Sequence, residues 1–317
     1  MSNPFVDQRR LVEGDAAVSI DAGVVLVTGP DRFDVLNATL SQDLRGLAVG
    51  DSRDALELDG QGRIQHSIHV LESSDGTLLV VPGALGVDVA AWLDARIFME
   101  DVQAADVSSQ FSVWGGAVAF GDLAWTDPWP DVAPGGITYG DARIPAWSWV
   151  ETLLPAGEKP TVDVIGADLV DPLRVVAGRP SMAEVDDRSL PHELDWLRTA
   201  VHLSKGCYPG QETVSKIHNV GHPPRRLVRL HLDGSDSVFV EASDPVWAGG
   251  DLVGRVTTAG NHFEDGPVAL AVIKRNVDVT ALLSVVHDDH LLTATQQVLV
   301  PPSAGATAAE RLRPSRP

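Results

Sequence analysis

The sequence predicts an α+β protein with a separate β-barrel at its C-terminal end. Helix-like and strand-like hydrophobic patterns alternate up to about residue 220. The chain after it consists of short strand-like runs at even spacing, which are typical of a small barrel. Pro223 and Pro224 lie between the two regions, and two consecutive prolines cannot continue a helix or a central strand. The 317 residues are enough for two or three domains of about 100 to 200 residues each.

Strands and helices are expected to alternate in the N-terminal region. Residues 17–28 are rich in Val and predict a strand pair that turns near Gly23. Asp31 is a suitable N-cap for the helix that follows, and Gly-containing turns separate the later strands. The expected elements are strands over 17–28, 55–58, 64–71 and 78–81, short strands between 103 and 154, and helices over 32–40, 87–99, 168–178 and 191–201.

The C-terminal region is expected to hold only strands, followed by a tail. The tail is rich in Pro, Ala and Arg, a composition that favours disorder at a chain end. The expected strands cover 227–232, 238–240, 252–258, 268–273 and 290–299. The sequence therefore divides into an N-terminal arm (1–16), an α+β region (17–220), a β-barrel (221–300) and a disordered tail (301–317).

Charge and composition disfavour several classes of partner. The formal net charge of −20 opposes binding to nucleic acid and to anionic membranes. No apolar run reaches the roughly 18 residues of a membrane-spanning helix. The single Cys excludes an intrachain disulfide and an all-Cys metal site, and the first residues lack the apolar core of a signal peptide. We therefore expect a cytoplasmic protein with no metal and with neither nucleic acid nor membrane as a direct partner.

The densest polar cluster is Lys-Gly-Cys-Tyr-Pro-Gly-Gln-Glu, residues 205–212. Its Pro209-Gly210 pair fits a type II turn, because Pro presets φ at the second position and Gly supplies a positive φ at the third. Cys207, the only thiol of the chain, lies in this loop. Lys205 is two residues away and could lower the pKa of the thiol. The alternative is that Cys207 is buried and inert, as most lone cysteines are.

These eight residues resemble the signature of the YgfZ family, folate-binding proteins related to the aminomethyltransferase (T-protein) of the glycine cleavage system. The cluster matches this signature from Lys205 to Glu212 without departure. Residues 23–44, 174–180, 191–194, 254–256 and 268–275 resemble further parts of the family, so the resemblance covers roughly residues 17–300.

The resemblance implies a ring in which two interleaved α+β subdomains and a C-terminal barrel surround a folate-binding opening. It implies tetrahydrofolate as the cofactor and a role in the assembly or repair of iron–sulfur enzymes, one of which modifies tRNA. The partners would then be folate and iron–sulfur client enzymes, with Cys207 and Lys205 as the reactive groups. Two alternatives remain: a folate-dependent one-carbon transferase or demethylase, and an adaptor that has lost folate.

One departure separates the sequence from the T-protein branch. In T-proteins a Gly-Val-Ile stretch precedes paired aspartates, one of them catalytic. The matching stretch here runs from Gly62 to His66 and has Gln65 and His66 in place of the acids. Aminomethyl transfer needs an anion at the folate nitrogen. We therefore expect no aminomethyltransferase activity.

Candidate folate contacts come from chemistry and from the resemblance together. A carboxylate can accept two parallel hydrogen bonds from the pterin edge, and Glu184 matches the T-protein residue with this role, with Asp186 as a competitor. The folate tail carries carboxylates and favours Arg, which points to Arg225 and Arg226. Tyr208, Gln211 and Glu212 of the motif complete the expected binding set.

Tryptophan is concentrated between residues 103 and 154. A cluster of indole rings can stack on a flat ligand or can simply pack a core, and the sequence leaves both possibilities open. His218 and His222 are spaced as a helical metal pair, but Asn219, Gly221 and Pro223 make a helix there unlikely on sequence grounds. The tryptophans of the cluster are Trp114, Trp125, Trp129, Trp147 and Trp149.

Overall fold

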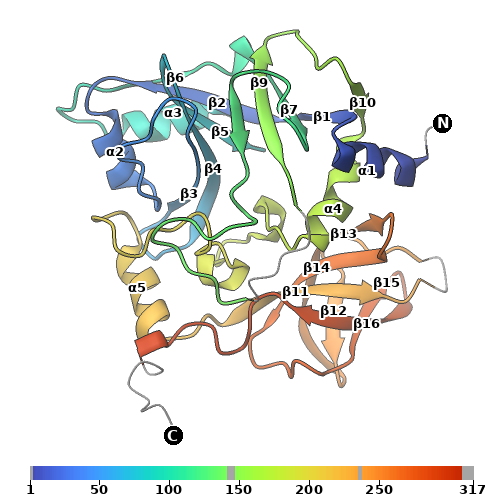
Figure 1. Cartoon of the computed structure of the whole chain (residues 1–317). Helices are drawn as coiled ribbons and strands as arrows, with labels where there is room; N and C mark the ends of the chain where they lie inside the picture. The colour runs from blue at the N-terminus through green and yellow to red at the C-terminus, as the bar shows by residue number, and fades with distance from the viewer. Residues whose placement is uncertain (1–2, 141–146, 235–237, 309–317) are drawn as a thin grey trace, which may run out of the picture.

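The computed structural model describes residues 3–140, 147–234 and 238–308. It contains two five-stranded sheets and a closed six-stranded barrel (Figure 1). The chain starts in the second sheet with β1, builds the whole first sheet from β2 to β6, and then returns to the second sheet with β7 to β10. The two α+β units are therefore interleaved, and the expected fold class is confirmed.

The first sheet has the order β3-β4-β5-β2-β6, and all its neighbouring strands are antiparallel. Helices α2 and α3 cover one face, where Leu36 and Leu93 pack against Ile68 and Leu79 in a buried cluster. Its elements are β2 (Ala22–Thr28), α2 (Arg32–Thr39), β3 (Ser52–Leu58), β4 (Ile64–Ser73), β5 (Gly76–Pro82), α3 (Gly86–Asp94) and β6 (Gln103–Asp106).

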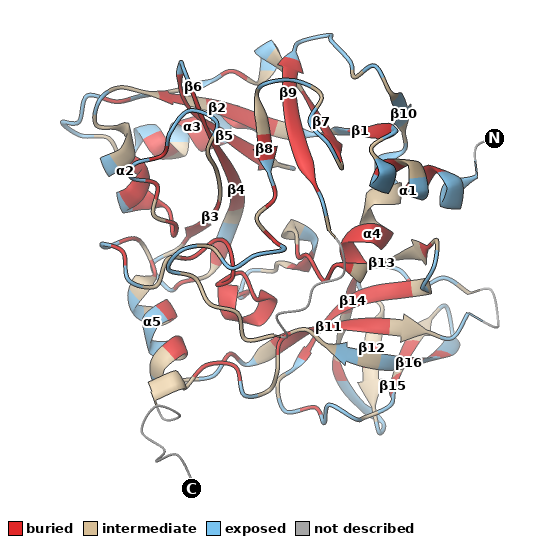
Figure 2. Cartoon of the chain, viewed as in Figure 1, coloured by how far each residue is buried: buried red, intermediate tan, exposed pale blue. Residues whose placement is uncertain are grey.

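The second sheet has the order β10-β1-β7-β9-β8 and packs on the other face of the first sheet. Val18 and Leu153 of this sheet share one apolar cluster with Leu71 and Val80 of the first. Figure 2 shows the buried residues concentrated along these inner strands. Its elements are α1 (Pro4–Glu13), β1 (Ala16–Ile20), η1 (Ser108–Gln110), β7 (Phe111–Gly116), β8 (Ala124–Thr126), β9 (Val150–Pro155), β10 (Asp163–Ile165), η2 (Ala167–Leu169) and α4 (Val170–Val176).

The C-terminal strands close into a barrel of order β11-β14-β13-β12-β15-β16, with β11 pairing to β16. The seven registered pairs between β11 and β14 begin at Arg225 and Lys274, directly after the double proline. The strands are β11 (Arg225–Leu232), β12 (Pro245–Ala248), β13 (Asp251–His262), β14 (Gly266–Lys274), β15 (Leu283–His287) and β16 (His290–Val298).

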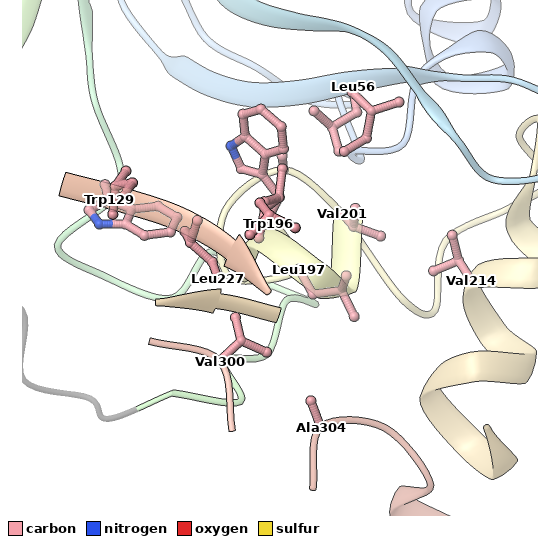
Figure 3. Close-up of a cluster of buried hydrophobic side chains, with 14 of the residues drawn as sticks. Leu56, Trp129, Trp196, Leu197, Val201, Val214, Leu227, Val300 and Ala304 are labelled. Atoms are coloured by element: carbon pink, nitrogen blue, oxygen red, sulfur yellow. The ribbon is translucent and has the colours of Figure 1, made fainter. Parts of the chain in front are cut away.

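A segment without strands follows α4 along the chain and packs between the first sheet and the barrel. It holds the short helices η3 (Met182–Glu184) and η4 (Pro191–Leu194) and the helix α5 (Gln211–Val220). Figure 3 shows its buried core, in which Trp196 and Leu197 lie between Leu56 of β3 and Leu227 of β11. This core therefore connects the first sheet to the barrel through residues far apart in the sequence.

Several local expectations were wrong. The helix expected over 191–201 is the four-residue η4, which ends at Asp195 with a left-handed φ of 57°. A helix was not expected near His218, yet α5 runs to Val220, because the helix breakers Gly221 and Pro223 lie just beyond its end. β12 and β15 are short and were missed, whereas residues 238–240 form no strand.

The described part of the expected disordered tail is ordered. Ala304 is buried in the core between the first sheet and the barrel, and its carbonyl lies 2.7 Å from Nδ1 of His222. Thr307 donates a hydrogen bond to the carbonyl of His218 in α5. Residues 301–308 therefore pack on α5, and the rest of the expected tail, residues 309–317, lies outside the described residues. Of the helices in the described ranges, none combines the length and the hydropathy that a bilayer span requires.

Candidate functional site

A cavity of about 390 Å³ lies between the two sheets and the segment that follows β10. This volume is within the range of roughly 300 to 1,000 Å³ that is usual for small-molecule sites. Its walls come from the ends of β1 and β5, from β4, from the β8–β9 region and from residues 167–183. The tryptophans Trp125, Trp147 and Trp149 line it, so three members of the tryptophan cluster contribute to a cavity wall.

One side of the cavity carries a histidine–carboxylate pair that joins the two sheets. Nδ1 of His69 on β4 lies 2.7 Å from a carboxylate oxygen of Glu151 on β9. The other oxygen of Glu151 accepts a hydrogen bond of 3.3 Å from the indole of Trp149. The imidazole ring stacks on Trp125 with a centroid distance of 3.8 Å and an interplanar angle of 5°. The ring of His69 is therefore fixed in position and orientation.

Charge interactions favour the protonated form of this histidine. Burial lowers the pKa of His69, but the interactions with Glu151 and Asp54 together exceed this effect, and the net pKa lies above the usual value. Asp54 acts in the same direction and Arg179 opposes it. His69 thus retains its proton at a higher pH than an exposed histidine.

A second buried network forms the neighbouring wall. Arg179 donates from Nε to Asp127 at 3.0 Å and is paired at 3.0 Å with Asp54. Asp127 also accepts the indole hydrogen of Trp147 at 2.9 Å. Although burial lowers the pKa of the Arg179 guanidinium, Asp127 and Asp54 raise it, so Arg179 stays charged. This network fixes Trp147, which is only partly buried, against the cavity.

Two carboxylates at the rim of the cavity are more accessible. Asp21 is exposed at the end of β1. Asp171 is paired with Arg174 at 3.0 Å, and 49% of its side chain remains exposed. Carboxylates in this position can accept hydrogen bonds from a ligand that enters the cavity.

Glu184, the expected pterin reader, does not line this cavity. It is fully buried, and its oxygens accept from the backbone N–H of Ser181, from the hydroxyl of Thr258 and from the guanidinium of Arg174, at 2.6–2.7 Å. Although burial raises its pKa, Arg174 lowers it, and the net pKa is below the usual value. Protein donors occupy both oxygens in this structure, and the contact of Glu184 with a pterin stays a prediction.

The expected tail-binding residues also have protein partners. Arg225 is paired with Asp186 and with Glu193. Although burial raises the pKa of Asp186, the hydrogen bond from Arg225 holds it well below its usual range. Arg226 is fully buried and donates to the carbonyl of Val277, and burial lowers its pKa to about 10. Neither Arg lines the cavity, so the structure does not bring the expected binding set together.

The ammonium of Lys205 is bound by backbone carbonyls. Its buried Nζ donates to the backbone carbonyls of Asn37, Leu40 and Gln42 at 2.5–2.7 Å. Burial lowers the pKa of Lys205 to about 7. The proposed activation of Cys207 by Lys205 is therefore not supported by the geometry, and Lys205 instead holds the segment after α2.

The rest of the motif forms a loop on the first sheet, with the expected turn. Gly210 has φ 77° and ψ −2°, as the third position of a type II turn requires. A Cβ on Gly210 would lie 2.5 Å from Cα of Gly62, so the loop packs tightly on the β3–β4 turn. Tyr208 is buried in the adjacent core, Gln211 donates to the carbonyl of Lys205, and Glu212 is exposed. Cys207 is exposed as well.

The positions aligned with the T-protein acids lie outside the cavity. Gln65 is exposed, and Nδ1 of His66 lies 2.8 Å from Glu57. The residues of β4 that line the cavity are Ser67 and His69. The sequence analysis did not find the pair of His69 and Glu151. The available signal was the two-residue spacing of Trp149 and Glu151, which places both side chains on the same face of a strand.

The comparisons agree with this architecture. The glycine cleavage system aminomethyltransferase T from Bartonella henselae superposes with a TM-score of 0.71 over 94% of this chain and 89% of that chain, at 18% identity. The chain therefore has the fold of an aminomethyltransferase T-protein.

Similarity in sequence is weaker. The chloroplastic candidate transferase At1g60990 of Arabidopsis thaliana is 24% identical in an alignment that covers 80% of this chain and 63% of that protein. The chain thus spans less than two thirds of this relative's length. No family model matches the chain.

Proposed function

We propose that the protein is a cytoplasmic, YgfZ-like folate-binding protein that holds tetrahydrofolate in the cavity between its two sheets. The observation that carries the proposal is the tryptophan-lined cavity with carboxylates at its rim, in a chain with the T-protein fold. A flat pterin can stack on an indole such as Trp147. Its aminopyrimidinone edge can donate to Asp21 or Asp171, the accessible carboxylates of the rim.

The donor set fits the ring of a reduced folate better than its tail. Arg174 and Arg179 line the cavity, and each is already paired with carboxylates. The negatively charged glutamate tail therefore gains little from them, and the proposal places it toward solvent. Folate supplies a carrier nitrogen for one-carbon units when it is bound, whereas the chain supplies the stacking surface and the hydrogen-bond acceptors.

Tetrahydrofolate is expected to bind the wild-type protein, and Trp147→Ala is expected to weaken binding. Loss of one aromatic stack costs roughly 0.5–1.5 kcal/mol, or about 2- to 12-fold in Kd. Anaerobic calorimetric titration measures this change. Trp92→Ala is the matched control, because Trp92 lies in α3, outside the cavity. Equal affinity of all three proteins would show that tetrahydrofolate does not bind in this cavity. Absence of binding to the wild-type protein would show that tetrahydrofolate is not the ligand.

We further propose that the protein acts in the assembly or repair of iron–sulfur enzymes, without aminomethyl transfer. The support is the motif of residues 205–212, which presents the thiol of Cys207 at the surface, where a client protein can reach it. The positions aligned with the T-protein acids are Gln65 and His66, which carry no carboxylate. Both residues also lie outside the cavity in which folate would bind.

Cys207→Ser is expected to abolish complementation of the iron–sulfur defect in a strain that lacks this protein. The side chain is exposed, so the substitution should change the free energy of unfolding by no more than about 0.5 kcal/mol and leave folate affinity unchanged. Ser204→Ala, at another exposed position of the same loop, is the control. Full complementation by Cys207→Ser would show that the thiol has no role.

A folate-dependent transferase is the second candidate. The pair of His69 and Glu151 favours it, because a histidine backed by a carboxylate in a cavity can exchange protons with a substrate. The Arabidopsis relative is likewise described as a candidate transferase. Turnover of a methylamine-loaded carrier protein in the presence of tetrahydrofolate would favour this candidate over the first.

A further inference from the structure

His69 lines the cavity, and its two ring nitrogens differ in their partners. Nδ1 is paired with Glu151, which orients the ring and keeps a proton on this nitrogen. Within the described residues Nε2 has no hydrogen-bond partner, and His69 lines the cavity. Trp125, fully buried and bonded through its indole to the carbonyl of Arg53 at 2.7 Å, supports the flat face of the imidazole. Nε2 thus belongs to a ring that is fixed at the cavity wall, and it has no partner among the described residues.

The charged groups around this imidazole come from four parts of the chain. Glu151 on β9 and Asp54 on β3 favour the imidazolium, and Arg179 opposes it. Asp127, which follows β8, is engaged by Arg179 and lies in the same wall. The carboxylates next to the ring raise the pKa of His69 above its usual value, so the imidazolium persists to a higher pH than in an exposed histidine.

Two other buried groups that can carry a proton, His192 and Lys205, are not available to a ligand in the cavity. Nε2 of His192 lies 3.1 Å from the carbonyl of Val214, and burial lowers the pKa of His192 to about 3. Lys205 is bonded to three carbonyls and does not line the cavity. Of the described histidines and lysines, His69 is therefore the one that lines this cavity.

We infer that His69, oriented by Glu151, is the proton donor and acceptor of the cavity for a basic ring nitrogen of the bound ligand. The inference rests on the proposed folate site. In the forward step the bond between Nε2 and its hydrogen breaks, and the proton bonds to the lone pair of the ligand nitrogen. The positive charge moves with the proton, and the neutral His69 keeps the proton on Nδ1, where it is hydrogen-bonded to Glu151. The reverse step restores the imidazolium, so no oxidant or further reactant is needed.

The test is a histidine NMR titration of the wild-type protein with and without tetrahydrofolate. We expect the His69 resonances to titrate above the usual histidine range in the free protein. Bound tetrahydrofolate should shift the Nε2 resonance and change the titration midpoint. A midpoint and an Nε2 resonance that tetrahydrofolate leaves unchanged, although it binds, would overturn the inference but not the folate site. Absence of binding would overturn both.

Variants give a second measurement on the same point. His69→Gln should remove the pH dependence of the Kd for tetrahydrofolate, which in the wild type changes by up to about tenfold per pH unit near the midpoint. Glu151→Gln should move the midpoint to lower pH, because the carboxylate that stabilises the imidazolium is gone. His66→Gln on the same strand is the control and should keep the wild-type profile, because His66 lies outside the cavity.

The ligand offers its own control. In 5-formyltetrahydrofolate the ring nitrogen is acylated and no longer basic. The pH dependence of the Kd for this folate should therefore be the same in the wild type and in His69→Gln. An identical pH profile for the two folates, or for wild type and His69→Gln, would overturn the assignment of His69.

Discussion

Glu184→Ala is expected to lower the free energy of unfolding by about 3–5 kcal/mol, the usual cost of leaving a buried charge without its partner. Glu184 is fully buried, and its loss leaves the guanidinium of Arg174 with only the half-exposed Asp171 as a counter-charge. It also leaves the hydroxyls of Thr257 and Thr258 without their shared acceptor. Urea denaturation of the purified variant measures the effect.

Acid pH provides an independent check on the same residue. The pKa of Glu184 is lowered in the folded protein, so its contribution to stability is complete above the unfolded pKa of about 4.3 and decreases as the pH falls through the folded value. The difference between wild type and Glu184→Ala should therefore narrow in acid. Asp187→Ala is the control, because the side chain of Asp187 is 84% exposed. A stable Glu184→Ala variant that has lost only folate affinity would instead restore the pterin-reading role suggested by the sequence.

Lys205→Met is expected to destabilise the protein by at least about 3 kcal/mol. Each buried carbonyl left without a donor costs about 1–3 kcal/mol, and Lys205 serves those of Asn37, Leu40 and Gln42. Thermal or urea denaturation measures the loss. Lys216→Met is the matched control, because Lys216 is exposed on α5 and should change stability by less than about 0.5 kcal/mol.

The same variant tests the role of Lys205 that the sequence suggested. If its ammonium activated the thiol, Lys205→Met would leave stability unchanged and slow the alkylation of Cys207. Loss of stability with an unchanged alkylation rate in the folded protein would instead confirm the structural role.

The architecture could be predicted because its signals are local. The double proline marks the barrel boundary, and the strand periodicity before and after it gives the two kinds of region. The turn at Gly210 also follows from residue types alone, since Pro and Gly fix its φ angles. Short strands such as β12 and the helix α5 are harder to predict, because Gly221 and Pro223 disfavour a helix in the sequence although they lie just beyond the end of α5.

The cavity could not be predicted because its residues meet only in three dimensions. His69 and Glu151 are 82 positions apart and belong to different sheets. Strand periodicity indicates which residues share a face but not which faces oppose each other. For Glu184 the sequence did contain a structural signal: Ser181 and Glu184 have the spacing of a capping box, and both hydrogen bonds of that motif are present.

The contact of Glu184 with Thr257 and Thr258 has a consequence for the order of biosynthesis. Residues 167–183, which form one wall of the cavity, are followed directly by Glu184, whose acceptor oxygens are bonded to hydroxyls of β13 in the barrel. A nascent chain in which β13 has not yet left the ribosome lacks the hydrogen bonds from Thr257 and Thr258 to Glu184. The wall of the cavity next to Glu184 is therefore fixed to the barrel only once β13 has been synthesised.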